Sequence, residues 1–462
     1  MTAAEALRIG PGSPGGFWQR AGDWVAWSGA AVRLGGRGPD GRGLRDLARR
    51  GGELLAGLEE APPEVPLHAP RSGVEPGADA PGTRARFYGG SSFSGAVGGG
   101  GWRAFGACSF VLPRIEVRAE AGRTWMAGVA RVEADRDPEA AREDLGRRLG
   151  GLRERLLAGN GAAPLERGDA RRGDGEAGLG ARLTSPLDRR RWDEIVERAL
   201  EEIRAGRLAK VVLARPLDVE LERPVDPVAL LLRLRADHPA SFPYLIDPGE
   251  GAVFVGAAPE IVAAVRGGRF QATVVAGTCA RGASQDEDEA LARELLESAK
   301  DQEEHALVLR DLRDRLSDLA PQVEADAEPT ILRLRELQHL RTEVTASLPG
   351  EAHVLEVLER LHPTAAVNGY PREPARAFLR RHEPFERGWY AGPVGWFDAA
   401  GDGVFAVALR CGLVQGRRLR LYAGAGIVDG SEAGREWEET VLKFRPVLDA
   451  LRDLYSGRPG GA

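Results

Sequence analysis

Lysine is rare in this chain, which makes its few lysines informative about chemistry. Among 63 lysine and arginine residues, only Lys210, Lys300 and Lys443 are lysines. A lysine that loses its proton in a dry pocket can act as a base, whereas arginine stays charged in proteins. We therefore expect the three lysines to lie where arginine could not replace them. The alternative for each is a solvated helix face, where most charged side chains are found.

Two carboxylates and one lysine share one side of the last predicted helix, residues 434–455. At about 100° per residue, Glu436, Glu439 and Lys443 lie within about 60° of one another. An apolar stripe on the adjacent side is suited to packing and consists of Trp437, Val441, Phe444 and Leu448. The helix should therefore pack on one side and present two carboxylates and an amine beside it. The alternative is an ordinary exposed ion pair of Glu439 with Lys443.

A second pair of carboxylates lies in residues 286–316, a stretch that is predicted to form one long helix or two. Asp301 and Glu304 share one face of it. Two such faces could meet around Mg²⁺, which prefers oxygen ligands, takes few from protein and keeps positions for water and a substrate anion. His305, beside Glu304, is expected to be a hydrogen-bonded structural residue rather than a metal ligand.

An acid and a base are predicted at two strand ends. Lys210 begins the predicted strand 210–217 and shares a face with Val212 and Ala214, whose small apolar side chains suit a desolvated amine. Glu260 follows a proline in an apolar, glycine-rich setting, which should raise its pKa and let it act as a general acid. With Lys210 as a neutral base, the two pKa values would be pushed in opposite senses. The alternative for Glu260 is a turn carboxylate that caps the next segment.

A run of small residues, 423–426, follows another predicted strand. Gly424 and Gly426 would let the backbone approach a ligand closely and would offer N–H groups to an anion. The run is not a dinucleotide-binding fingerprint, because neither its spacing nor the residue that follows fits.

The overall composition excludes several classes of protein. The chain has 462 residues, 43% of them hydrophobic and 29% charged, and a net charge of −6. These values are typical of a globular protein and argue against a nucleic-acid or anionic-membrane binder. Three scattered cysteines form neither a disulfide framework nor a zinc site. We see no signal peptide and no apolar run long enough to cross a membrane, which predicts a cytoplasmic protein.

The order of the predicted elements indicates an α+β fold with large, mainly antiparallel sheets, because strands and helices interleave without a βαβ rhythm. Further helices are predicted at 138–157 and 188–205. Further strands are predicted at 252–256, 270–276, 388–397, 403–413 and 418–423. Residues 333–341 form a further short segment, and loops are predicted at 61–84 and 158–180.

Together these motifs resemble those of the chorismate-utilising enzymes, and within them the isochorismate synthases. The resemblance extends over about residues 180–456, with ten runs in the family's order: 210–215, 254–260, 276–278, 300–305, 337–340, 361–367, 390–394, 408–410, 423–426 and 436–440. Two earlier runs, 86–90 with Phe93 and 112–116, resemble the amino-terminal half of isochorismate synthases.

Two positions discriminate between members of the family. Anthranilate synthases typically carry glutamine where this chain has Lys210, so the resemblance implies that water rather than ammonia attacks. Aminodeoxychorismate synthases carry a nucleophilic lysine where this chain has Ala276, so covalent capture is not expected. Salicylate synthases share both features and remain the alternative. A third possibility, a silent relative that only binds a chorismate-like anion, is disfavoured because a binder needs no matched acid and base.

The resemblance also implies roles for the acid, the base and the metal ligands. Lys210 would deprotonate the water that attacks C2 of chorismate, and Glu260 would protonate the departing C4 hydroxyl. Glu304 and Glu436 would hold Mg²⁺, which binds the ring carboxylate. The waters of the metal would be steered by Asp301 and Glu439.

The remaining implied roles concern the substrate. Tyr390, Arg410 and the backbone of residues 424–426 would bind the enolpyruvyl carboxylate, which a guanidinium can grip with two hydrogen bonds. The site would also be lined by Thr278, His339 and Lys443. Two positions depart from the family pattern: Asp301 is shorter than the glutamate of some relatives, and Cys279 replaces a basic or polar residue.

For the architecture, the resemblance implies one large fold of two mainly antiparallel sheets packed together, with helices outside. Residues 1–180 would be an amino-terminal part integrated into that fold, 181–456 the catalytic part, and 457–462 a disordered tail. We expect a monomer with chorismate as its small-molecule substrate. The choice between menaquinone, siderophore and salicylate pathways stays open at this stage.

Overall fold

The computed structural model describes residues 15–20, 22–36, 43–58, 84–120, 122–132, 135, 137–158, 180–350 and 352–455. The loops predicted at 61–84 and 158–180 lie outside these residues except for their end positions. The tail predicted at 457–462 lies outside them entirely. Among the described residues, no helix is both long and apolar enough to cross a membrane.

The described strands alternate with helices in no regular rhythm. The strands are β1 (Gly15–Arg20), β2 (Asp23–Gly36), β3 (Arg86–Ser91), β4 (Cys108–Glu120), β5 (Arg123–Gly128), β6 (Ala181–Thr184), β7 (Lys210–Leu221), β8 (Phe242–Asp247), β9 (Val253–Ala258), β10 (Ile261–Arg266), β11 (Arg269–Ala280), β12 (Val323–Ala325), β13 (Thr330–Arg333), β14 (Leu337–Ser347), β15 (Gly369–Tyr370), β16 (Pro393–Asp398), β17 (Gly403–Val407), β18 (Cys411–Gln415) and β19 (Arg418–Ile427).

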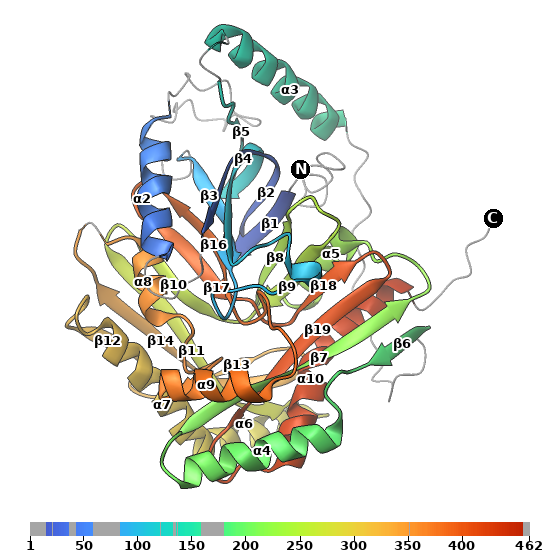
Figure 1. Ribbon diagram of the computed structural model, residues 1–462, viewed down its shortest axis with the longest axis vertical. Coiled ribbons are helices and arrows are strands. Elements are labelled where there is room, and N and C mark those ends of the chain that lie inside the picture. The colour runs from blue at the N-terminus through green and yellow to red at the C-terminus, as the bar shows by residue number, and fades with distance from the viewer. Residues whose placement is uncertain are drawn as a thin grey trace.

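The helices of the described part are α2 (Gly43–Ala56), α3 (Pro138–Ala158), α4 (Arg189–Arg204), α5 (Pro227–Asp237), α6 (Gln285–Glu297), α7 (Ala299–Leu316), α8 (Val354–Leu361), α9 (Arg372–His382) and α10 (Ala433–Tyr455). They lie around the sheet (Figure 1). The predicted α+β class with a large antiparallel sheet is confirmed, since every strand pairing among the described residues is antiparallel.

The two sheets that we expected are joined into one. A first arm runs in the order β1, β8, β9, β18, β19, β7, and a second arm runs β3, β16, β17, β10, β11, β14. The long strands β2 and β4 pair with each other and connect the arms through β1 and β3. The β2–β4 register shifts between Ala30 and Val32. Such an irregularity bends and twists a strand, which helps one sheet to fold back on itself.

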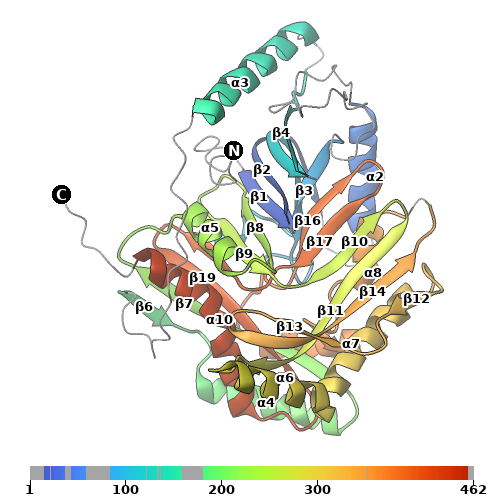
Figure 2. The same ribbon diagram turned by 180° about the vertical axis from the view of Figure 1, so that it is seen from behind.

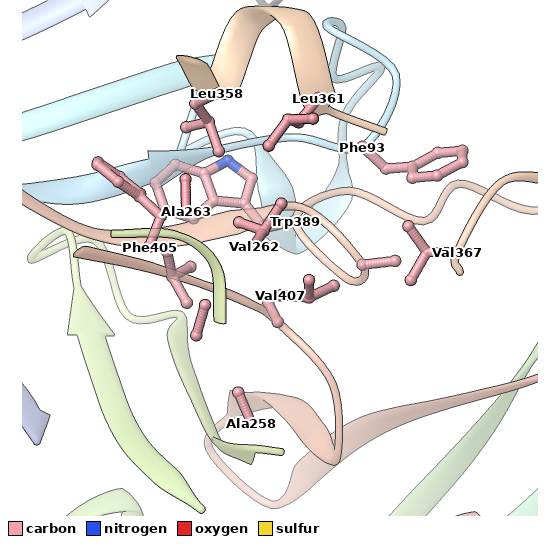
Figure 3. Close-up of a cluster of buried hydrophobic side chains, with 14 of the residues drawn as sticks. Phe93, Ala258, Val262, Ala263, Leu358, Leu361, Val367, Trp389, Phe405 and Val407 are labelled. Carbon is pink, nitrogen blue, oxygen red and sulfur yellow. The ribbon is translucent and has the colours of Figure 1, made fainter. Parts of the chain in front are cut away.

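The main hydrophobic core contains residues from both arms and from helix α8. Figure 3 shows Leu358 and Leu361 of α8 close to Trp389, with Val262 and Phe405 from the second arm nearby. Trp389 is fully buried, and its indole N–H donates to the Gly106 carbonyl oxygen at 2.9 Å. A second core cluster lies where α5 and α10 pack on the first arm. Packing in the main core fixes the position of the two arms relative to each other.

The two helices that carry the candidate carboxylates pack on strands of different arms. Helix α7 contacts β11 of the second arm, and α10 contacts β19 of the first. Figure 2 shows both helices on the same half of the molecule, in gold and in red. The arms therefore bring α7 and α10 together although the helices are more than 100 residues apart in sequence.

Of the two forms expected for the stretch 286–316, the structure shows two helices, because Ser298 caps the second one, accepting from the backbone N–H of Asp301. Other local expectations differ from the structure. The strand predicted at 403–413 is two strands, since Arg410 takes a left-handed backbone conformation (φ 48°) between β17 and β18. The strand predicted at 388–397 begins only at Pro393. The short segment at 333–341 belongs to β13 and β14.

Candidate active site

A partly enclosed cavity of about 90 Å³ lies between the two arms. Its walls come from β7 and β19 on one side, β11 and β14 on the other, and helices α7 and α10. Eleven of the expected site residues line it: Lys210, Glu260, Thr278, Glu304, His339, Tyr390, Arg410, Gly424, Gly426, Glu439 and Lys443. The other two, Asp301 and Glu436, lie beside it on the same helices as Glu304 and Glu439.

Lys210 is almost completely buried, with 1% of its side chain exposed, and its Nζ lies 2.9 Å from Oε1 of Glu304. We expected a desolvated amine beside small apolar side chains; the amine is buried, and the structure adds an ion pair that the sequence did not indicate. Burial by itself would raise the pKa of Glu304. The charge and hydrogen bond of Lys210, helped by Lys443 and Lys300, outweigh burial and hold that pKa below its ordinary value.

Lys443 pairs with Glu439 across one turn of α10. Its Nζ lies 2.6 Å from Oε1 of Glu439 and donates to the Gly424 carbonyl oxygen at 2.9 Å. The pair is part of the pocket wall, so the alternative of an ordinary wet surface pair is not what the structure shows. Burial, together with the nearby charges of Glu436 and Glu304, raises the pKa of Glu439 to about 6 in spite of Lys443.

Lys300 completes the set, and it is a residue to which the sequence assigned no role. Its Nζ lies 2.9 Å from Oε1 of Glu436, which is buried. Each lysine of the chain therefore pairs with a different glutamate of one acidic cluster. The scarcity of lysine was the signal that could have assigned Lys300 to the site.

Asp301 is fixed at the start of α7 rather than turned towards a lysine. The Ser298 hydroxyl donates to its carboxylate, and Gly277 lies against it. A Cβ atom at Gly277, whose φ is 76°, would approach Cβ of Asp301 to 3.1 Å. The shorter side chain of aspartate is thus accommodated by a close contact between β11 and α7.

The carboxylates of Asp301, Glu304, Glu436 and Glu439 have the chemistry that a hard divalent cation requires. They do not form a complete set of ligands arranged around one point. Within the described ranges, no group of three histidine, cysteine, aspartate or glutamate side chains is arranged to hold a metal. Mg²⁺ needs only one or two carboxylates and keeps several waters. Glu304 and Glu436 come from two facing helices, and the lysine contacts recorded for them use only Oε1 of each. These two carboxylates therefore suit Mg²⁺.

His305 behaves as the sequence suggested. Its Nε2 lies 2.8 Å from Oγ1 of Thr342, and its side chain is buried between α7 and β14. Burial lowers the pKa of this histidine to about 4. It is a neutral, hydrogen-bonded core residue that helps to hold α7 in place.

Glu260 lies in the pocket wall at the junction of β9 and β10, with 4% of its surface exposed. Burial raises its pKa to about 8, although the charge of Lys210 acts in the opposite direction. Its side chain has no helix to cap, so the capping alternative does not apply. A carboxylic acid that keeps its proton at neutral pH can donate that proton to a leaving group.

Arg410 offers a guanidinium to the pocket from the tight turn between β17 and β18. Its Nη2 donates to Nε2 of His339 at 3.1 Å, while its buried Nη1 has no hydrogen-bond partner in the described part of the chain. Nε2 of His339 must therefore be the acceptor, and its Nδ1–H faces Thr278 Oγ1 at 3.1 Å and the Gly277 carbonyl oxygen at 3.3 Å. Burial lowers the pKa of Arg410 to about 10, which leaves it charged at neutral pH.

Gly424 and Gly426 lie inside β19, not after a strand as expected. They pair with Ala214 and Val212 of β7. The reason for glycine is space. A Cβ atom at Gly426 would lie 2.5 Å from Oε1 of Glu304, and one at Gly424 would lie 3.0 Å from the Tyr390 hydroxyl. The two glycines thus leave room for the acid of the Lys210 pair and for the tyrosine.

Aromatic and aliphatic residues form the rest of the pocket. Tyr390 stacks on Tyr422, with ring centroids 5.0 Å apart, and the Tyr422 hydroxyl accepts from the indole N–H of Trp102. Tyr422 was not singled out in the sequence. Apolar wall positions also include Val212, Val275, Ala366, Val367 and Leu409. Of these, Val212 was on the face that alternation assigned to Lys210.

Cys279, which had no explanation in the sequence, lies on β11 against helix α6. Its Sγ is 3.7 Å from the Leu291 carbonyl oxygen. Burial, followed by the charges of Asp301 and Asp288, raises the pKa of this thiol to about 11. It is a protonated packing residue and does not face the pocket cavity.

These features define a class of protein: an enzyme with a buried acid, a buried amine, a carboxylate cluster and a guanidinium around one small-molecule pocket. The comparisons with known proteins agree. Residues 71–452 match the family model described as chorismate binding enzyme. The chain belongs to the chorismate-binding enzyme family.

Two relatives are isochorismate synthases by name. The salicylate biosynthesis isochorismate synthase of Pseudomonas aeruginosa is 40% identical over 267 residues, which is 58% of this chain and 56% of the relative. An isochorismate synthase of Bacillus subtilis is 37% identical over 265 residues, 57% of this chain and 56% of the relative. The chain therefore spans little more than half the length of these relatives.

A solved structure extends the likeness to nearly the whole fold. The menaquinone-specific isochorismate synthase from Escherichia coli superposes with a TM-score of 0.72 at 27% identity, covering 98% of this chain and 91% of that chain.

Proposed function

We propose that this protein is an isochorismate synthase, which converts chorismate to isochorismate. The observation that carries the proposal is the pocket, which contains Lys210 and a Glu260 whose pKa is raised to about 8. Isomerisation by addition of one water and loss of the C4 hydroxyl as another water needs a base and an acid in one site. The names of the relatives support the same activity.

In the proposed reaction, Lys210 takes a proton from the water that attacks C2 of chorismate. Glu260, protonated at neutral pH, gives its proton to the C4 hydroxyl as that group leaves. The buried pair of Lys210 with Glu304 holds the amine in the pocket. To act as a base, Lys210 must first give up its own proton.

The carboxylate cluster is proposed to hold Mg²⁺, with Glu304 and Glu436 as ligands and Asp301 and Glu439 steering its waters. When bound, Mg²⁺ would neutralise the ring carboxylate of the substrate and polarise it. The contact of Lys300 Nζ on α7 with Glu436 Oε1 on α10, at 2.9 Å, supports this assignment, because it brings the two helices that carry these carboxylates near one another.

Another part of the pocket is proposed to bind the enolpyruvyl carboxylate. Nη1 of Arg410 has no hydrogen-bond partner among the described residues and matches a carboxylate oxygen. Tyr390 and the backbone at Gly424 and Gly426, which also line the pocket, are proposed to share this role. His339, which accepts a hydrogen bond from Arg410, is proposed to line the site together with Thr278 and Lys443.

Several wider expectations remain proposals. We propose that residues 181–456 form the catalytic part and that residues 1–180 are an integrated amino-terminal part. Pairing of β1 with β8 and of β3 with β16 supports this integration. We also propose a monomeric, cytoplasmic enzyme of menaquinone or siderophore synthesis.

The test is to incubate the purified protein with chorismate and Mg²⁺ and to separate the products by chromatography, with a matched sample in EDTA. Isochorismate that reaches equilibrium with chorismate, and that is absent with EDTA, is the expected result. Accumulation of salicylate and pyruvate would instead assign the protein as a salicylate synthase. Unchanged chorismate in both samples would contradict an enzymatic role.

A further inference from the structure

Lys300 is the one lysine for which the proposed reaction has no use. Its Nζ lies 2.9 Å from Oε1 of Glu436, and the two side chains differ sharply in exposure, 38% for Lys300 and 4% for Glu436. The ammonium group therefore reaches a buried carboxylate from the solvent side. Lys210 and Lys443, by contrast, pair with Glu304 and Glu439 in the wall of the cavity.

Helix stability does not explain a lysine at this position. Lys300 is the second residue of α7 (Ala299–Leu316), where a positive charge opposes the helix dipole. Ser298 already caps this helix end. A cation at residue 300 instead provides a partner for Glu436. A carboxylate that is buried without a partner strongly destabilises a protein.

We propose that Lys300 is a displaceable counter-ion for Glu436. It holds this carboxylate in place while no divalent cation is bound, and it lowers the affinity for the cation by competing with it. The proposal rests on the proposed function in one respect, since it takes Glu436 as a ligand of Mg²⁺. Lys300 is thus a positioning residue that sets how much Mg²⁺ the site requires.

Lysine is suited to this exchange in a way that arginine is not. A lysine ammonium is a compact charge on a flexible stem and can move out into water, whereas an arginine fork binds both oxygens of a carboxylate in a fixed plane. In this structure the recorded contact of Lys300 uses Oε1 of Glu436. In a chain that otherwise relies on arginine, a lysine here keeps the carboxylate available to a metal.

The experiment compares four forms of the full-length protein by thermal unfolding during a titration with MgCl₂, in the absence of chorismate. They are the wild type, Lys300→Met, Lys300→Arg and the control Arg435→Met. Arg435 pairs with Glu432 at the start of α10, with 79% and 64% of the side chains exposed. The control removes a cation near the cluster without removing a partner of Glu436.

Lys300→Met should unfold at a lower temperature than the wild type in EDTA, because Glu436 loses its counter-ion. Its half-saturating Mg²⁺ concentration should fall by roughly five- to tenfold, since the competing charge is gone. Lys300→Arg should keep the stability in EDTA but raise the half-saturating concentration. Arg435→Met should match the wild type in both respects.

A half-saturating Mg²⁺ concentration that is unchanged or higher in Lys300→Met would overturn the proposal, as would the absence of any Mg²⁺ effect on the wild type. If Lys300→Met does not fold, Lys300→Gln serves in its place with the same expected direction. The readout does not involve chorismate. Mg²⁺ responses as expected in a protein that leaves chorismate unchanged would therefore refute the proposed function but not this inference.

Discussion

Nζ of Lys210 lies 2.9 Å from Oε1 of Glu304, so the proposed base and a proposed metal ligand form one buried ion pair. Lys210 comes from β7 of the first arm, and Glu304 comes from α7, which packs on β11 of the second arm. The pair links the proposed base to the proposed metal site, because a cation that binds Glu304 would also lie close to the amine of Lys210. The proposed chemistry therefore depends on how the arms are held together.

Replacing Lys210 by arginine should abolish turnover while preserving the fold. Arginine can still pair with Glu304, but it cannot give up its proton. Loss of a general base costs about 10²- to 10⁴-fold in kcat. Steady-state kinetics with chorismate, together with a melting curve as the control for folding, would measure this. Full activity of Lys210→Arg would rule out Lys210 as the base.

Glu260 should set the alkaline limit of activity. Burial raises its pKa to about 8, so the proton that it donates is present below that pH and lost above it. The rate of isochorismate formation should fall as the pH rises through about 8. Glu260→Gln, which cannot donate an acidic proton, should be slower by about 10²-fold or more and should lack this limb of the profile.

The same carboxyl group should also affect stability. Between its ordinary pKa of 4.5 and its raised pKa of about 8, the folded protein keeps a proton on Glu260 that the unfolded chain has lost. Stability therefore falls as the pH rises through that window. Relative to the wild type, Glu260→Gln should gain stability between pH 5 and pH 8 in urea unfolding. If the free energy of unfolding differed between Glu260→Gln and the wild type by the same amount at pH 5 and at pH 8, the pKa of Glu260 would not be raised.

Gly426→Ala should damage the site without unfolding the protein. The added Cβ would lie 2.5 Å from Oε1 of Glu304, a movable side-chain atom, so the carboxylate must shift away from Lys210. We expect a fall in kcat of at least about tenfold, with little change in melting temperature. Gly52→Ala on helix α2 is the matched control, because an added Cβ there meets nothing within 4 Å. Wild-type kinetics for Gly426→Ala would show that this spacing is unimportant.

Arg410→Lys should weaken substrate binding. A lysine cannot contact His339 and grip a substrate carboxylate in the planar geometry of a guanidinium. KM for chorismate should rise by about tenfold or more, with a smaller effect on kcat. His339→Ala should change KM in the same direction, since Nε2 of His339 accepts from Arg410. A change in kcat alone would place Arg410 in the chemical step instead.

The local pattern of the sequence predicted the elements of the site better than their contacts. Period-3.6 spacing placed Glu436, Glu439 and Lys443 together on one face of α10, and alternation placed Val212 beside Lys210. Both are short-range properties. The pairing of Lys210 with Glu304 depends on the closure of the two arms, and no local pattern contains that information.

Backbone geometry accounts for the other differences. Gly424 and Gly426 have a composition typical of a loop, yet they continue β19 because β7 supplies the ladder partners. Arg410 interrupts a run of residues that favour a strand, because the turn there needs a left-handed backbone conformation (φ 48°). Tertiary pairing overrode local preference in the first case, and the turn between β17 and β18 did so in the second.

The proposed mechanism depends most directly on water as the attacking group. The measurement is to run the reaction in H₂¹⁸O and to analyse the isolated isochorismate by mass spectrometry at low conversion. We predict one ¹⁸O atom in the new C2 hydroxyl of the product and none in chorismate that has not reacted. Isochorismate without the label would contradict attack by a water that Lys210 deprotonates.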